Sequence, residues 1–459
     1  MRNVIYLIIG CVVASCSTIP DQSYHKIKCL DRYRCSESEL DTYIKAQSLN
    51  NIVIVNGWSG VNEKNLKRHK GNVYVSPKFQ QFYLEYDEMG HKIENNRQLD
   101  LIKRAIDIAE KPIYLIIFIH GWHNNASIDI NNPSLDTTGF PYMLARRAYA
   151  KGDMDVIGVY IGWRGEKYKN NPAKLLSIKN RALIADAIGK EGELRDDLIS
   201  LTQSVNNKPT SGHSLLIGHS LGGRLLSRAF LEDLSKIENI NDWSLGKNSL
   251  LVTLNAAIGA DAFDKIFDNM SSADQPIQRP LWINLTSKDD KATSLYFPYA
   301  RLIGINLVDS PTSGKYTTVG HYMPYLSHEV TVIHGFDKKA ECGFINPEEI
   351  LNRNNTSWFE LPKRENSSCA TRYLYQYKNF NVSDGHYYTT VLRKLDENPE
   401  KPLGYMWNFR VDSSVIDFSK EESRVNKSSG AHNAFVQTNL GRMLDDMLFT
   451  QPLKQSVLI

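Results

Sequence analysis

The sequence predicts an α/β protein in which helices cover both faces of a doubly wound, mostly parallel sheet of eight strands. Three observations support this fold class. Segments that are apolar on both faces, such as 113–119, alternate with stretches of helical periodicity. The 459 residues, of which 42% are hydrophobic, suffice to bury a large core. The alternation breaks only over 296–403, which we interpret as a long insertion before the last strand.

The expected elements follow in a regular order. Short strands are expected at 72–76 and 81–87, followed by a helix over 95–110 that ends before Pro112. Buried strands are expected at 113–119, 156–161, 213–218, 249–254 and 281–285, and a last strand at 405–411. Helices are expected at about 142–150, 177–205, 221–234 and 434–449.

These elements suggest a division of the chain. The expected units are a signal peptide (1–15), a polar tether with N-terminal decoration (16–70), the first part of the core (71–295), an insertion or cap (296–403) and the last strand and helix (404–459).

The distribution of charged and apolar residues argues against a nucleic-acid-binding protein and against a membrane-spanning helix. Lys and Arg total 54 and Asp and Glu total 51, so the formal charge is only +3. No basic run is long enough to track a phosphate backbone, so we expect no nucleic-acid partner. No apolar run reaches the 18 or so residues that a membrane-spanning helix needs.

The first sixteen residues have the features of an export signal. A cationic start precedes an apolar stretch over 4–14, which ends in Val13-Ala14-Ser15-Cys16. This pattern resembles the signal of bacterial lipoproteins, which implies cleavage before Cys16 and its acylation by palmitate-type chains. The alternative is an ordinary cleaved signal with an incidental cysteine. The resemblance implies a cell-envelope protein with a lipid anchor and, because Ser17 rather than Asp follows, the outer membrane in a Gram-negative host.

Four cysteines remain beyond the signal. Cys29, Cys35, Cys342 and Cys369 allow three pairings, of which Cys29 with Cys35 and Cys342 with Cys369 closes the shortest loops. An oxidising compartment would permit these bridges. The cysteines lack the paired CxxC spacing of a zinc site, so no structural metal is expected.

A nucleophile motif follows one buried strand. Gly218-His219-Ser220-Leu221-Gly222 fits the pattern G-x-S-x-G, with the strand of 213–218 before it and a helix after it. Small flanking residues let the serine occupy a strained turn, where the positive end of the helix stabilises a developing oxyanion. We therefore expect Ser220 to be a nucleophile rather than part of a structural turn.

A second motif follows the strand of 113–119. His120-Gly121-Trp122 stands where the chain resembles an α/β-hydrolase of the esterase and lipase kind. The resemblance implies an oxyanion hole made by the backbone N–H groups of Trp122 and Leu221, with His120 and Gly121 supporting the loop. Gly121 would let the backbone approach closely.

The remaining triad members are assigned from the family's chain order of serine, acid and histidine. Ser287-Lys288-Asp289-Asp290 follows the strand of 281–285, and its spacing favours Asp290 over Asp289. His432, between the last strand and the last helix, has the position of the base, with His386 next and His321, His328 and His334 as further competitors. The 142 positions between Asp290 and His432 exceed the family's usual separation.

The sequence therefore predicts a lipid-anchored serine hydrolase that cleaves carboxylic or lipid acyl esters through Ser220, His432 and Asp290 and needs no cofactor. One alternative is a peptidase or amidase using the same triad. Another is a non-catalytic surface binding protein, in which an activity-based fluorophosphonate probe would leave Ser220 unlabelled.

Overall fold

The computed structural model describes the central part of the chain and several shorter segments. The described residues are 23–31, 34–47, 53–55, 73–75, 79–127, 140–141, 143–145, 147–148, 151–166, 177–272, 280–298, 316–334, 373–380, 387–394, 404–411, 444–445 and 448–449.

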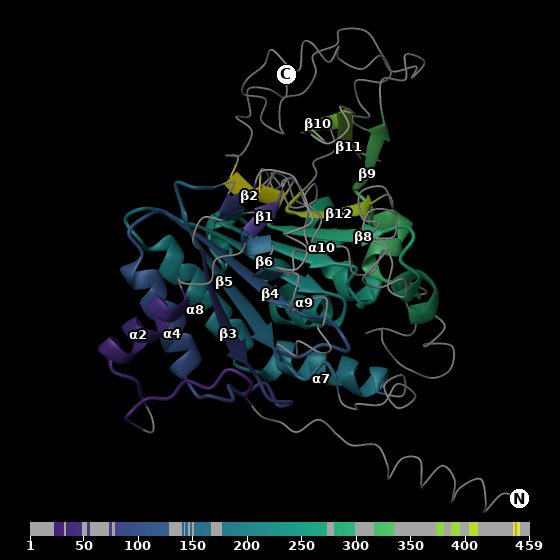
Figure 1. Ribbon diagram of the computed structural model, residues 1–459. Coiled ribbons are helices and arrows are strands. Elements are labelled where there is room, and N and C mark those ends of the chain that lie inside the picture. Colours follow the sequence, from purple (N-terminus) through teal and green to yellow (C-terminus); the bar gives the residue numbers. More distant parts are fainter. Residues whose placement is uncertain are drawn as a thin grey trace, which may run out of the picture.

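A ten-stranded sheet forms the centre of the molecule (Figure 1). Its strand order is β10-β11-β9-β12-β8-β7-β6-β4-β5-β3, and the eight strands from β9 to β3 in this order are parallel. The strands are β3 (Phe79–Glu85), β4 (Ile113–Ile119), β5 (Asp155–Gly162), β6 (His213–His219), β7 (Ser249–Leu254), β8 (Trp282–Ser287), β9 (His328–His334), β10 (Tyr373–Phe380), β11 (Tyr387–Lys394) and β12 (Met406–Val411). The predicted α/β class and mostly parallel sheet are confirmed.

The insertion predicted over 296–403 contributes three strands to this same sheet. β9 adds to β12 in parallel, and β11 and β10 follow in antiparallel order. A separate pair, β1 (Val53–Val55) and β2 (Val73–Val75), forms a small antiparallel sheet.

Helices connect the parallel strands. They are α4 (Arg97–Ile108), α7 (Ile178–Glu191), α8 (Leu194–Asn206), α9 (Leu221–Leu234) and α10 (Asp264–Ser272), and α2 (Glu37–Gln47) precedes them. Short helical turns are η1 (Ile240–Asp242), η2 (Ala260–Phe263), η3 (Ala292–Tyr296), η4 (Val319–His321) and η5 (Met323–Tyr325). None of the helices within the described residues is both long and apolar enough to cross a membrane.

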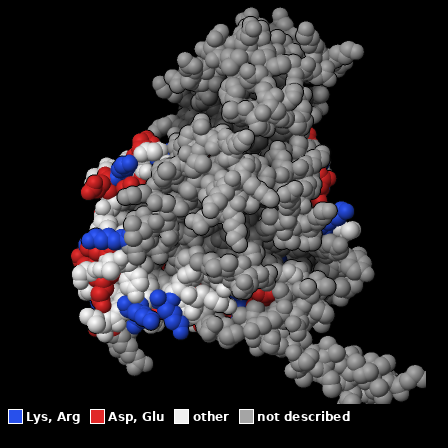
Figure 2. Space-filling model, viewed as in Figure 1, with Lys and Arg blue, Asp and Glu red and all other residues white. Residues whose placement is uncertain are grey.

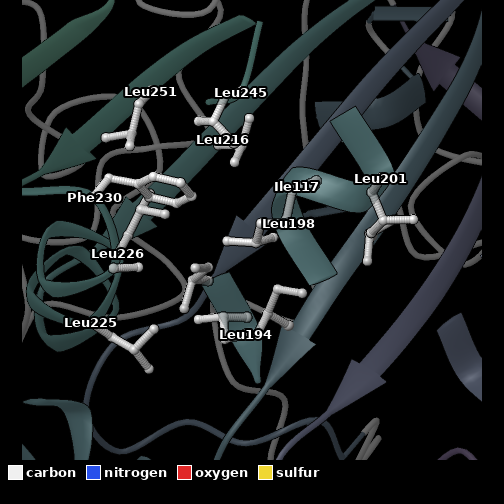
Figure 3. Packing of buried hydrophobic residues seen from close by; sticks show 14 of the residues in the cluster. Ile117, Leu194, Leu198, Leu201, Leu216, Leu225, Leu226, Phe230, Leu245 and Leu251 are labelled. Carbon is white, nitrogen blue, oxygen red and sulfur yellow. The ribbon is translucent and has the colours of Figure 1, made fainter. Parts of the chain in front are cut away.

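Each face of the sheet carries its own hydrophobic core, because side chains alternate along the strands. In β4, Leu115 and Ile117 pack with leucines of α8 and α9 on one face (Figure 3). Tyr114 and Ile116 point to the other face, where their cluster includes Phe140, Leu144 and Ala148. Both faces of β4 are fully buried, which explains its continuous apolar sequence.

The chain changes direction across the sheet between β4 and β6. From β4 it continues to β5 on one side, whereas from β6 it continues to β7 on the other. In open parallel sheets, ligands bind outside the carboxyl ends of the strands at such a switch point. This topology singles out the loops that follow β4 and β6.

Two expected elements differ from the structure. The helix expected over 177–205 is two helices, because the backbone of Gly192 is extended (φ −81°, ψ 171°) and ends α7 there. The segment 16–70, expected to be a tether with little periodicity, includes α2, whose Leu40 and Ile44 join the main core. Only 444–445 and 448–449 of the last expected helix are described, and they are helical.

Candidate active site

Ser220 lies at the switch point, in the turn between β6 and α9. Its φ of 55° and ψ of −117° form a conformation that residues with a side chain rarely adopt. Its N–H donates to the carbonyl of Leu254 at 2.9 Å, and its own carbonyl accepts from the N–H of Ala257 at 3.1 Å. The backbone after β7 therefore holds the serine in this strained turn.

The glycines around Ser220 are required by close backbone packing. A Cβ at Gly222 would lie 2.3 Å from the carbonyl oxygens of Ile119 and His120, at the end of β4. A Cβ at Gly218 would lie 2.7 Å from the carbonyl oxygen of Gly222. The motif predicted from the sequence thus lets the start of α9 pack against the loop that follows β4.

The expected oxyanion loop lies against the serine. A Cβ at Gly121 would be 2.9 Å from the Cβ of Ser220, so the two residues are in direct contact. Within the described residues, the N–H groups of Trp122 and Leu221 donate to no protein acceptor. Backbone N–H groups without a competing acceptor, close to a nucleophile, are what a tetrahedral oxyanion requires.

His120 supports this loop from within the protein. Its side chain is fully buried, and the backbone N–H of Trp163 donates to its Nε2 at 3.2 Å. Because Nε2 accepts, the neutral ring carries its proton on Nδ1, which donates to the carbonyl of Gly121 at 2.9 Å. The indole of Trp163 is stacked on the imidazole and donates to the His120 carbonyl at 2.8 Å. These contacts fix the orientation of the peptide between Gly121 and Trp122.

The two candidate acids are in different environments. Asp290 is 1% exposed, whereas Asp289 is on the surface. Oδ1 of Asp290 accepts from the N–H of Ala292 at 2.9 Å, and Oδ2 accepts from the hydroxyl of Thr293. The turn is fixed by Asn255, whose Oδ1 accepts from the N–H of Ser287 at 2.9 Å. The two donors fix the orientation of the buried Asp290 carboxyl group, which makes it the better candidate for the acid that orients a catalytic imidazole.

A histidine of the insertion approaches this acid indirectly. Nε2 of His321 is 3.1 Å from Oγ1 of Thr293. Since the hydroxyl proton of Thr293 is donated to Asp290, its oxygen accepts from His321. Burial lowers the pKa of His321, the negative charge of Asp290 opposes this shift, and the positive charge of Arg410 adds to it.

The other candidate bases are placed as follows. His432, the predicted base, lies outside the described residues, as does His386. His328 begins β9, is fully buried, and its Nδ1 is 2.8 Å from Oγ of Ser327. His334 ends the same strand.

Backbone strain is concentrated around the serine. Five described non-glycine residues have a positive φ, and three of them follow the neighbouring strands β4, β6 and β7: His123 (67°), Ser220 (55°) and Asn255 (46°). Such strain is typical of functional sites. Asn255 and Thr293 are site residues that the sequence analysis missed, because neither belongs to a recognisable motif.

The described residues hold no group of three or more His, Cys, Asp or Glu side chains that could bind a metal ion. Cys29 and Cys35 form a disulfide with Cα atoms 5.1 Å apart, and Cys342, Cys369 and Cys16 lie outside the described residues. On the face shown in Figure 2, the described acidic and basic side chains are interspersed.

The chain matches no known family model, and neither a curated protein nor a solved structure is significantly similar to it. The functional interpretation therefore depends on the geometry of the site itself.

Proposed function

We propose that the protein is a serine hydrolase of the α/β-hydrolase type that cleaves carboxylic esters, including lipid acyl esters. The observation that carries this proposal is the strained turn of Ser220 in direct contact with Gly121, the residue before the expected oxyanion donor Trp122. The same serine stands at the switch point of the parallel sheet, where open sheets of this kind bind their ligands.

The proposed reaction uses the site residues in the usual order of a triad. Oγ of Ser220 attacks the acyl carbonyl, and His432 accepts the hydroxyl proton and returns it to the leaving alcohol. Asp290 orients the imidazole and stabilises its cationic form. The N–H groups of Trp122 and Leu221 stabilise the tetrahedral oxyanion, and water then releases the acid from the acyl-enzyme.

The proposed location is the cell envelope, with the acylated Cys16 as a membrane anchor. It depends on the sequence of residues 1–16 alone.

The test compares hydrolysis of p-nitrophenyl butyrate with that of peptide p-nitroanilides. Ser220→Ala should lower ester kcat by at least about 10³-fold, since loss of a triad nucleophile costs up to about 10⁶-fold. Ser227→Ala is the matched control, because Ser227 lies on α9 and its buried hydroxyl donates to the carbonyl of Gly223 at 2.7 Å. Ester turnover that survives Ser220→Ala would refute the proposal, and faster cleavage of the anilides would favour an amidase.

The base is assigned by a parallel pair of variants. His432→Ala should reduce ester kcat as strongly as Ser220→Ala, whereas His321→Ala should retain most of the activity. The opposite result would make His321 the base and leave the hydrolase proposal intact.

A further inference from the structure

The N-terminal segment Ser23–His25 is bound at the same edge of the sheet as Ser220. Its binding partner is Glu85, the last residue of β3, which is 2% exposed. Oε1 of Glu85 accepts from the hydroxyl of Ser23 and from the N–H of His25, each at 2.9 Å, and Oε2 accepts from the N–H of Tyr24 at 2.9 Å. A buried carboxylate with three donors from one short segment is a specific docking site for that segment.

His25 links the segment to the expected oxyanion loop. Its Nε2 donates to the carbonyl of Ala126 at 2.7 Å, and its ring is stacked on Tyr83. Ala126 lies only four positions after Trp122 in the same loop. A Cβ at Gly162 would be 2.7 Å from the Cβ of Ala126 and 3.1 Å from Cγ of Glu85, so the loop and the docking site are in contact.

The position of the expected anchor limits how far this edge can be from a membrane. Cys16 precedes Ser23 by seven residues, which span at most roughly 25 Å when fully extended. An acyl chain on Cys16 would therefore hold the carboxyl edge of β3 close to the bilayer.

Two exposed apolar side chains lie on the turn after β3 and on α7. Met89, in the turn after β3, is 68% exposed, and Leu183 on α7 is 52% exposed. The turn is fixed to α7, because Glu88 is paired with Arg181 at 2.7 Å and the carbonyl of Gly90 accepts from the N–H of Glu193 at 2.9 Å. Large exposed apolar side chains close to an anchor are suited to contact with lipid.

We propose that docking of Ser23–His25 on Glu85 fixes the molecule on the bilayer so that Met89, Leu183 and the mouth of the Ser220 site face the lipid. The substrate is then an acyl ester within the membrane that carries the anchor. The choice of substrate depends on the proposed hydrolase activity, whereas the orientation depends only on the proposed anchor at Cys16.

The first test measures orientation without activity. Acylated protein on phosphatidylethanolamine–phosphatidylglycerol vesicles receives a benzophenone side chain at position 89, 183 or 108, one at a time. Ile108 is the matched control, because it is 41% exposed and ends α4, at the opposite edge of the sheet. Irradiation should crosslink lipid at 89 and 183 and not at 108, and Glu85→Ala with His25→Ala, which removes the acceptor of all three donors and the imidazole, should reduce these crosslinks at least fivefold. Equal crosslinking at 108, no effect of the double variant, or an unacylated Cys16 would overturn the proposal.

The second test measures the substrate class. Met89→Asp and Leu183→Asp should each lower hydrolysis of a vesicle phospholipid about tenfold, which corresponds to about 1.4 kcal/mol, and leave hydrolysis of soluble p-nitrophenyl butyrate unchanged. Ile108→Asp should change neither rate. Equal losses on both substrates would contradict the membrane substrate. A wild-type chain that cleaves neither ester would refute the proposed function and leave the orientation to be decided by crosslinking.

Discussion

Gly121→Ala is the substitution that most directly probes the contact between the oxyanion loop and the nucleophile. The added Cβ would lie 2.9 Å from the Cβ of Ser220 and 3.1 Å from Nδ1 of His219. Carbon atoms in van der Waals contact are about 3.5–4.0 Å apart, so the loop must move by roughly 0.6–1 Å. A displacement of about 1 Å at a catalytic centre can cost about 10²-fold in rate. We therefore expect ester kcat to fall about 10²-fold.

The control for this substitution is Gly152→Ala. A Cβ at Gly152 meets no atom within 4 Å, so this variant adds the same methyl group without a clash. Both variants are assayed with p-nitrophenyl butyrate, and thermal unfolding verifies that they are folded. We expect Gly121→Ala to lose about 1–3 kcal/mol of unfolding free energy, as is typical of overpacking. Wild-type kcat in Gly121→Ala would show that Gly121 and Ser220 do not form one catalytic unit.

Three further predictions concern the acid, the core and the N-terminal segment. Thr293→Val removes the hydroxyl that donates to Asp290. We expect ester kcat to fall about tenfold with little change in KM, because a hydrogen bond to a charged group contributes about 1.5–3 kcal/mol. An unchanged kcat would show that Asp290 does not need this hydrogen bond. Arg147→Met leaves the carboxylate of Asp445 buried without its cation at 2.8 Å, and urea unfolding should show a loss of about 3–5 kcal/mol that Asp445→Leu partly restores. Burial lowers the pKa of His25 below 6.5, so near this pH the unfolded chain binds more protons than the folded chain. The free energy of unfolding should therefore decrease on acidification, and His25→Asn should weaken this pH dependence.

The central strands could be predicted from the sequence because both of their faces are buried. β4 has seven buried residues in a row, and β7 has six, so an apolar run marks each strand directly. The expected bounds of 113–119 and 249–254 agree with the structure. The edge strand β3 begins two residues earlier than expected, because partly exposed glutamines interrupt its apolar pattern.

The N-terminal segment could not be assigned in the same way. α2 has a polar sequence, in which Leu40 and Ile44 are buried in the core and Tyr43 packs against it partly buried. Its position depends on distant partners, such as Arg104, which donates to Asp41 at 2.9 Å. Contacts of this kind leave no periodic signal in the sequence.

The sequence predicts those candidate site residues whose identity is required by close packing. Gly121, Gly218 and Gly222 are glycines because a Cβ would meet backbone or side-chain atoms within 3 Å. Asn255 and Thr293 act through hydrogen bonds that only the fold creates, so the sequence did not reveal them. The choice of Asp290 over its neighbour agrees with its burial, whereas the assignment of His432 stays a prediction.

The most direct test of the account is covalent labelling of the proposed nucleophile. The purified chain is incubated with a fluorophosphonate, and the labelled residue is identified by mass spectrometry of its peptides. We expect one phosphonyl group per chain, on Ser220, and no labelling of the heat-unfolded protein. An active, folded chain whose Ser220 stays unmodified would contradict it.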